Sequence, residues 1–165
     1  MTVISAHKDT NALTLTFVTE FDASPERVWR VWREPRLLEK WWGPPTYPAT
    51  FVTHDFTVGG QSHYYMTGPE GDQPHGRWTI TAIDEPHRLE FIDGFATADG
   101  EPDPQFEPMR ASITLEPHGA GTRMTTVSTF PSVEVLEQYM AMGMEEGMRE
   151  ALGQIDALLA AGARV

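Results

Sequence analysis

The chain has no cysteine among its 165 residues. This absence excludes disulfides, thiolate metal sites and cysteine nucleophiles, and it is compatible with a reducing compartment. Long apolar runs are also missing, because no stretch approaches the roughly 18 apolar residues that a membrane-spanning helix needs. The first residues, "MTVISAHKDTNALT", lack the basic flank and apolar run of a signal peptide. We therefore expect a cytoplasmic protein.

Basic residues are scarce. Lysine and arginine number 12 against 24 aspartates and glutamates, which gives a formal net charge of −12. Such a charge repels phosphate backbones and anionic lipid surfaces. The composition therefore predicts that neither nucleic acid nor a membrane is a partner. The length fits one domain, which we take to span 1–165 with a core at about 12–160.

The first part of the chain predicts one strand followed by two short helices. The segment "ALTLTFVTEF" (12–21) alternates apolar and polar residues, the pattern of a half-buried strand. Ser24 then offers a helix N-cap, with Pro25 in the first turn. The second helix falls within "PRLLEKWWGPP" (35–45), where the glycine and two prolines end it.

The middle of the chain predicts an antiparallel meander, because short alternating stretches are separated by turn residues throughout. The expected strands lie near 49–56, 61–67, 76–83, 88–95, 109–116 and 122–129. The acidic, proline-rich connection 96–108 is long for a hairpin. It is either a lid or a mobile surface loop.

The C-terminal part predicts one long helix of roughly seven turns, because Ser132 can cap it and no proline follows. Met142, Gln138 and Glu145 fall on its polar side. One face of this helix combines methionines with aliphatic residues, namely Val133, Leu136, Met140, Met144, Met148, Ala151, Ile155 and Leu158. Methionine adapts to irregular neighbours, so this stripe either lines a cavity or fills an uneven core.

The strand pattern places large aromatic residues on the inner face of the sheet. Tyr64, Met66, Trp78 and Phe91 share the inward parity, and Asp93 falls on the same parity. A mostly apolar surface with a few polar groups is typical of small-molecule sites. Asp93 has an alternative role as the residue that begins a turn at "DGF". His54, whose parity is ambiguous, is expected to be solvated.

Several motifs resemble one protein superfamily. They are "FDASPERVWRVWREPRLLEKWWGPP" (21–45), "DFTVGG" (55–60), "MTGPEG" (66–71), "HGRWTITAIDEPHRLEFIDGF" (75–95) and "FPSVEVLEQYMAMGMEEGM" (130–148). Together they resemble the START-like SRPBCC superfamily, in the branch named for the activator of the ninety-kilodalton heat-shock chaperone's ATPase. The resemblance implies an α+β helix-grip fold. In that fold a curved antiparallel sheet of about seven strands wraps a long C-terminal helix, with two short helices after the first strand.

The resemblance also implies a hydrophobic cavity between the sheet and the long helix. Thr57 stands where the family commonly has an arginine in Asp-x-Arg-x-Gly-Gly, so any role of that arginine does not carry over. Together with the inward strand residues, the family cavity gives a predicted ligand-binding set of Trp42, Tyr64, Met66, Trp78, Phe91, Asp93, Met140, Met144 and Met148.

Three functions remain open from the sequence. The first is binding of a small, largely apolar molecule. The second is a chaperone-associated interaction module, for which Tyr139 and Met142, off the apolar stripe, are the only indications. The third is a cavity enzyme of cyclase or hydrolase type using Asp93, Tyr64 or an inward Arg110. We expect no metal and no cofactor, because the sequence contains no metal-binding motif and no cofactor-binding motif. The resemblance leaves a homodimer open.

Overall fold

The fold is one curved antiparallel sheet covered on one side by helices. The computed structural model describes residues 3–162. Its elements, in chain order, are β1 (Val3–Asp9), β2 (Thr14–Phe21), α1 (Pro25–Arg33), α2 (Pro35–Leu38), β3 (Ala49–His54), β4 (Gln61–Met66), β5 (His75–Asp84), β6 (Arg88–Ala96), β7 (Met109–His118), β8 (Gly121–Thr129), α3 (Val133–Ala141), α4 (Met144–Leu152) and α5 (Ile155–Gly162). The eight strands follow the order β1-β2-β8-β7-β6-β5-β4-β3, which confirms the predicted α+β class.

The sheet has one strand more than the sequence pattern predicted. β1 pairs with β2 in a hairpin, whose turn is held by the Asp9 carboxylate accepting hydrogen bonds from the backbone N–H groups of Asn11 and Ala12, at 2.9 and 3.0 Å. Among its described side chains, Ser5, His7 and Lys8 are exposed, and Ala6 packs partly against the core. These small or polar residues do not give the clear apolar alternation that identified the other seven strands.

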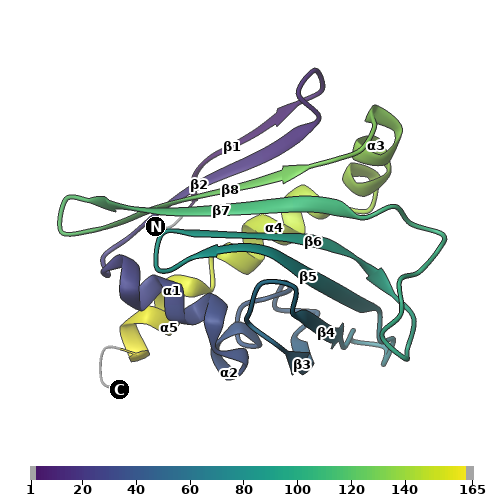
Figure 1. Cartoon of the computed structure of the whole chain (residues 1–165), viewed down its shortest axis with the longest axis horizontal. Helices are drawn as coiled ribbons and strands as arrows, with labels where there is room; N and C mark the ends of the chain where they lie inside the picture. Colours follow the sequence, from purple (N-terminus) through teal and green to yellow (C-terminus); the bar gives the residue numbers. More distant parts are fainter. Residues whose placement is uncertain (1–2, 163–165) are drawn as a thin grey trace.

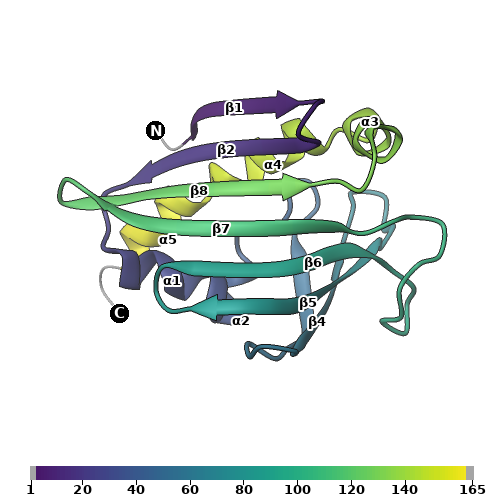
Figure 2. The same cartoon turned by 45° about the horizontal axis from the view of Figure 1, so that its top comes forward.

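The helices lie on one face of the sheet (Figures 1 and 2). α1 begins as predicted, because the Ser24 hydroxyl accepts a hydrogen bond from the Arg27 backbone N–H at 3.3 Å and Pro25 occupies the first turn. α3 lies at the opposite end of the sheet from α1 (Figure 1). α5 lies beside α1, so the three helices that follow β8 extend from one end of the sheet to the other (Figure 1).

Aromatic side chains fill the core beneath α1 and α2. The rings of Trp32 and Trp41 meet edge to face, with centroids 4.6 Å apart, and Trp78 stacks on Phe91 at 4.0 Å. All four residues are fully buried. Edge-to-face and stacked pairs of this kind add about 0.5–1.5 kcal/mol each beyond the burial of their area. This half of the sheet is therefore tightly packed.

His54 is half-buried and hydrogen-bonded, so the expectation of a solvated histidine is wrong. Its Nε2 lies 3.0 Å from the Trp32 carbonyl oxygen and its Nδ1 lies 2.7 Å from the Ser62 hydroxyl. Since a carbonyl only accepts, Nε2 carries the proton and Ser62 donates to Nδ1. A β-bulge after Phe51 resets the alternation. Both Phe51 and His54 can therefore face the core.

The predicted long helix is broken, and this is the main correction to the predicted fold. α3 ends at Ala141. Gly143, two residues later, has a left-handed φ of +85°, and its backbone N–H donates to the Met140 carbonyl oxygen at 3.0 Å. Glycine is favoured at such a helix end because it has no Cβ. A second, milder interruption at Gly153 separates α4 from α5. The break changes which side chains of α3 face inward.

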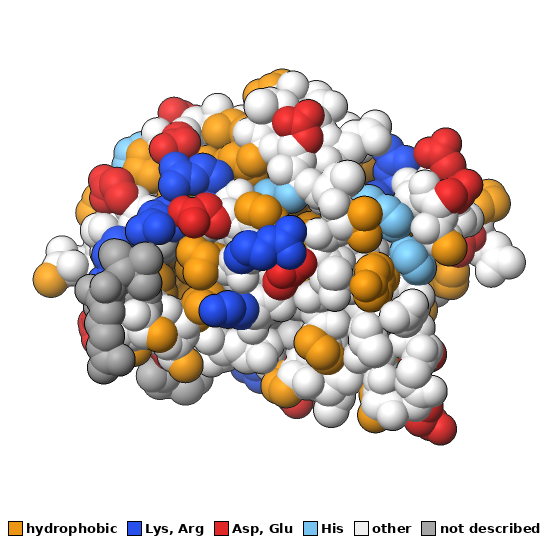
Figure 3. Space-filling model, turned by 90° about the horizontal axis from the view of Figure 1, so that it is seen from below, with side chains coloured by type: hydrophobic (Ala, Val, Ile, Leu, Met, Phe, Trp, Pro, Cys, Tyr) orange, Lys and Arg blue, Asp and Glu red, His pale blue; other side chains and the backbone are white. Residues whose placement is uncertain are grey.

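The surface is charged. On the face shown in Figure 3, several basic side chains lie among acidic ones. Two arginines of α1 form ion pairs with nearby glutamates. The Arg30 Nε lies 2.8 Å from a carboxylate oxygen of Glu34, and the guanidinium nitrogens of Arg33 lie 3.2 Å from Glu34 and 3.4 Å from Glu85. No helix within residues 3–162 is long and apolar enough to cross a membrane.

A candidate ligand-binding cavity

A cavity of about 230 Å³ lies between the sheet and the C-terminal helices. It is bounded by the inner faces of β4 and β6, by α4 and by the segment that follows α2. Most of its surface is apolar, and a few polar groups interrupt it. Its walls are formed by Trp42, Gly43, Pro44, Tyr64, Met66, Asp93, Gly94, Phe95, Met109, Tyr139, Met142, Met144, Gly147, Met148 and Ala151.

Strand alternation and one glycine place the polar centre of the cavity. Tyr64 lies on β4 and Asp93 on β6, with β5 between them. The Tyr64 ring crosses β5 over Gly76, where a Cβ would lie only 2.3 Å from Cζ and the hydroxyl oxygen of the tyrosine. Because Gly76 has no side chain, the Tyr64 hydroxyl reaches the Asp93 carboxylate and donates a hydrogen bond to Oδ1 at 3.3 Å.

Burial changes the acid–base chemistry of this pair. Removal from water raises the pKa of Asp93 to about 7, although the Tyr64 hydroxyl and the Gly94 backbone N–H both act to lower it. The pKa of Tyr64 is raised well above 10, first by burial and then by the charge of Asp93. Near neutral pH the Asp93 carboxyl therefore exists in both protonation states and can either donate or accept a hydrogen bond.

Tyr139 closes the α3 end of the cavity. It is buried, with 4% of its surface exposed, and its hydroxyl donates to the Glu107 carbonyl oxygen at 2.9 Å. Its ring stacks on Phe95, with centroids 5.8 Å apart. Burial, with a smaller effect of Asp93, raises the pKa of Tyr139 to about 12. The expectation that Tyr139 lies off the core is wrong, because the break at Gly143 rotates α3 relative to α4.

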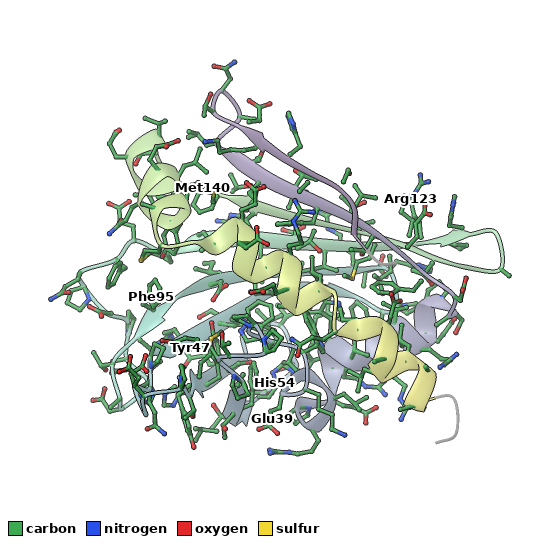
Figure 4. The ribbon with its side chains drawn as sticks, turned by 180° about the vertical axis from the view of Figure 1, so that it is seen from behind. Glu39, Tyr47, His54, Phe95, Arg123 and Met140 are labelled. Atoms are coloured by element: carbon green, nitrogen blue, oxygen red, sulfur yellow. The ribbon has the colours of Figure 1, made fainter. Side chains whose placement is uncertain are left out.

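The long loop after β6 supports this wall. Phe106 packs on Phe95 with ring centroids 4.6 Å apart. The Asp103 backbone N–H donates a hydrogen bond to the Phe95 carbonyl oxygen at 3.0 Å. Figure 4 shows Phe95 near the end of α4 from which α3 departs. The loop thus contacts the wall from outside and contributes no lining side chain beyond β6 itself.

The opposite wall is α4, which is anchored to the segment after α2 at its junction with α5. Met144, Gly147 and Met148 face the cavity. At the junction of α4 and α5, the Gln154 side-chain amide donates to the carbonyl oxygen of Gly43 at 2.8 Å and to that of Trp41 at 3.3 Å. These bonds join the helical wall to the segment after α2.

The structure brings six of the nine predicted ligand-binding residues together around the cavity, namely Trp42, Tyr64, Met66, Asp93, Met144 and Met148. It places the other three elsewhere. Trp78 and Phe91 lie in the packed core behind Trp42, whose ring meets Trp78 edge to face at 5.0 Å. Met140 is partly buried on α3 and packs against the core outside the cavity. Strand parity identified which side chains face the helices, but not which of them border the cavity and which are packed in the core.

Sequence reasoning missed several lining residues, for two different reasons. Phe95 shares the inward parity of Phe91 and Asp93, so the strand pattern already contained a signal for it. Tyr139 and Met142 had no such signal, since their orientation depends on the break at Gly143. Met142, 47% exposed, stands at the rim. Ala151 was already part of the predicted apolar stripe of the C-terminal helix. The remaining lining residues that were missed are Gly43, Pro44, Gly94, Met109 and Gly147.

Two other candidate features lie outside the cavity. Arg110, considered as an inward anion anchor, is exposed on β7 and pairs with Ile92 across the sheet. His63 and His75 stack 5.1 Å apart, with Nε2 and Nδ1 at 2.9 Å, and neither lines the cavity. Across the part of the chain that the structure describes, no cluster of three or more His, Asp or Glu side chains is arranged to hold a metal ion.

Comparison with known proteins gives consistent matches over nearly the whole chain. Residues 22–160 match the family model described as Activator of Hsp90 ATPase homolog 1-like protein. A solution structure of an Arthrobacter aurescens protein is 54% identical, covering 97% of this chain and 93% of that one, with a TM-score of 0.93. Protein Ms6760 from Mycobacterium smegmatis is 46% identical, covering 95% and 96% of the two chains, with a TM-score of 0.89.

A more distant likeness has the same architecture. A Staphylococcus epidermidis protein solved by NMR is 27% identical, covers 96% of this chain and 95% of its own, and has a TM-score of 0.83. Comparison with curated proteins finds no match. These likenesses support the helix-grip architecture and name no ligand.

Proposed function

The chain belongs to the family of Activator of Hsp90 ATPase homolog 1-like proteins, and from this premise we propose that it binds one small, largely apolar molecule between α4 and the sheet. The observation that carries the proposal is the cavity of about 230 Å³ walled by aromatic and methionine side chains. Its size lies below the roughly 300–1,000 Å³ of sites for drug-sized ligands. The ligand is accordingly small.

The side chains of the cavity wall support this role. Met66, Met144 and Met148 are unbranched and can adapt to the shape of a ligand, and Gly147 leaves the middle of the α4 wall without a side chain. In contrast, the neighbouring Trp78 and Phe91 are packed tightly against each other. The adaptable residues are thus concentrated where the helix faces the sheet.

The test uses a filled cavity. Propylbenzene serves as a small apolar probe, and its binding is measured by isothermal titration calorimetry. Met144→Trp places a larger side chain in the cavity and should abolish binding while the far-ultraviolet circular dichroism spectrum stays unchanged. The control is Val133→Trp, at a position on α3 that is 43% exposed and does not line the cavity. Undiminished binding by Met144→Trp would remove the proposal.

A complementary measurement looks for the natural ligand. The protein is purified gently from its own host and examined by native mass spectrometry, followed by denaturing extraction. A reproducible adduct of a small molecule, whatever its mass, supports small-molecule binding. A bare polypeptide mass in repeated preparations counts against it and favours an interaction role.

One observation favours a second candidate, a cavity enzyme. Asp93, with its pKa raised to about 7, lies 3.3 Å from the Tyr64 hydroxyl in a mostly apolar cavity. A general acid or base works best when its pKa lies near the working pH. If the chain transforms the ligand recovered from its host, Asp93→Asn should abolish turnover. Turnover that survives this substitution would exclude Asp93 as the acid or base.

A further inference from the structure

The cavity contains one carboxylate and no basic group. Within the described residues, its lining has no Lys, Arg or His. The other ionisable side chains that face Asp93 are two phenols, Tyr64 from β4 and Tyr139 from α3. Met109 of β7, the inner face of α4 and the segment 42–44 contribute none. When Asp93 is ionised, its charge therefore has no counter-charge in the cavity.

The carboxylate is positioned to meet a ligand. Asp93 lines the cavity. Among the described residues its one side-chain hydrogen-bond partner is the Tyr64 hydroxyl, at 3.3 Å, which is a long hydrogen bond. An ionised carboxylate in an apolar site is costly unless it is paired. This cost is why the pKa of Asp93 is raised to about 7. A positive charge on a ligand would supply the missing partner.

The remaining walls suit a cation attached to an apolar body. Rings of Trp42, Tyr64, Phe95 and Tyr139 border the same space, and the faces of aromatic rings attract ammonium groups. The formal charge of −12 raises the local concentration of cations and repels anions. A carboxylate ligand would meet Asp93 as a like charge, and a purely apolar ligand would leave an ionised Asp93 without a counter-charge.

We propose that the cavity binds a small apolar amine in its protonated form, with the ammonium group against the Asp93 carboxylate and the apolar part among the aromatic and methionine side chains. This inference rests on the proposed function, since it names the ligand class of the same cavity. The apolar part must be small, no larger than about one ring with a short chain, to fit a cavity of about 230 Å³.

Three probes of similar shape but different charge test the ligand class. They are 2-phenylethylamine (cation), propylbenzene (neutral) and 3-phenylpropanoate (anion), each titrated calorimetrically at pH 8. The amine should bind at least about tenfold tighter than propylbenzene, and the anion most weakly. Asp93→Asn should remove the advantage of the amine. The matched control Asp84→Asn, at an exposed position at the end of β5, should retain it.

The pH dependence gives a second readout that a merely structural role would not produce. Tyr64 and Tyr139 have raised pKa values and stay neutral between pH 5 and 8, so Asp93 is the group in the cavity that titrates. Affinity for the amine should fall as pH falls below about 7, approaching tenfold per pH unit. Affinity for propylbenzene should not fall. In Asp93→Asn both affinities should be independent of pH in this range.

The outcomes separate this inference from the proposed function. If propylbenzene binds and the amine binds no tighter, the amine inference is overturned while apolar binding stands. An amine preference that persists in Asp93→Asn also overturns it, because the charge pair would then lie elsewhere. If neither probe binds, both the inference and the proposed function are rejected. A preference for the amine that needs Asp93 and weakens at low pH supports the inference.

Discussion

At the scale of single residues, Asp93 links the chemistry of the cavity to the stability of the fold. Its pKa is raised from an ordinary value of 3.8 to about 7, mainly by burial. A raised pKa means that the folded state holds its proton more tightly than the unfolded state. The contribution of Asp93 to stability is therefore fully present below pH 4 and is lost as pH rises through about 7.

Replacing Asp93 with asparagine isolates this effect. The free energy of unfolding of the wild type, taken relative to Asp93→Asn, should decrease between about pH 4 and pH 7, by at most about 1.4 kcal/mol per pH unit. Urea denaturation at a series of pH values measures the difference. His54, whose pKa is lowered chiefly by burial, is present in both proteins and its opposite trend cancels. A difference that does not vary with pH would contradict the assignment.

Gly76 is the second residue on which the cavity depends, because the Tyr64 ring lies across it. In Gly76→Ala the new Cβ would lie 2.3 Å from the ring, so Tyr64 must move away from Asp93. We expect a loss of about 1–3 kcal/mol in the free energy of unfolding, as for overpacked sites. Chemical denaturation measures this loss.

The matched control is Gly147→Ala on α4, where a Cβ meets nothing within 4 Å. There the same substitution should stabilise the protein by about 0.5–1 kcal/mol, because alanine favours a helix interior. Equal effects at Gly76 and Gly147 would show that the Tyr64 crossing has no special requirement for glycine.

At the scale of elements, the break between α3 and α4 determines which side chains reach the cavity. Gly143 has a φ of +85°, whereas Gly153, at the junction of α4 and α5, has a φ of −63°. A left-handed conformation costs a residue with a Cβ about 1–2 kcal/mol. The two glycines therefore differ in what a substitution should do.

Gly143→Ala should lower the free energy of unfolding by about 1–2 kcal/mol. Gly153→Ala should be neutral or stabilising by up to about 1 kcal/mol, since its nearest neighbours, backbone oxygens at 3.4 and 3.5 Å, are at ordinary contact distance. Thermal and urea unfolding of the two variants compares them directly. A stabilised Gly143→Ala protein would mean that the helix can run through this position.

At the scale of the whole molecule, the excess of acidic residues opposes compaction. The formal charge of −12 causes self-repulsion in the folded state, which salt screens. Raising the NaCl concentration from about 0.01 M to about 0.15 M at pH 7 should therefore raise the unfolding temperature. Differential scanning calorimetry measures the shift.

The same salt series near pH 4.8, the isoelectric point of the sequence, provides the control, because the net charge there is close to zero. The shift should shrink at that pH. An unfolding temperature at pH 7 that falls or does not change on adding salt would mean that local ion pairs such as Arg30–Glu34 outweigh the general repulsion.

Much of the fold could be predicted from local patterns. Seven strands were found from alternation, and Ser24 and Ser132 were found as helix caps; the structure shows their hydroxyls accepting bonds from Arg27 and Val135. These features depend on residues close in sequence. β1 escaped prediction because its described side chains, Ser5 to Asp9, are small or polar and leave no apolar alternation to detect.

The candidate site was less predictable. Parity placed Trp78, Phe91 and Asp93 on one face of the sheet, yet only Asp93 lines the cavity. Whether an inward side chain borders a cavity or is packed depends on what covers it, and Trp42 covers Trp78. That contact joins residues from the segment after α2 and from β5, and no local pattern encodes it.

The sequence by itself determined the antiparallel strands, the absence of cysteine chemistry, the acidic charge and the family, because these follow from composition and from short-range periodicity. Only the tertiary structure decided that Tyr64 passes over Gly76 to reach Asp93 and that α3 turns at Gly143 to bring Tyr139 inward. Only the tertiary structure, too, brought Asp93 into a cavity without a basic group. The physical reason is that burial and counter-charge depend on neighbours that are distant in sequence, and these neighbours meet only when the sheet and helices pack together.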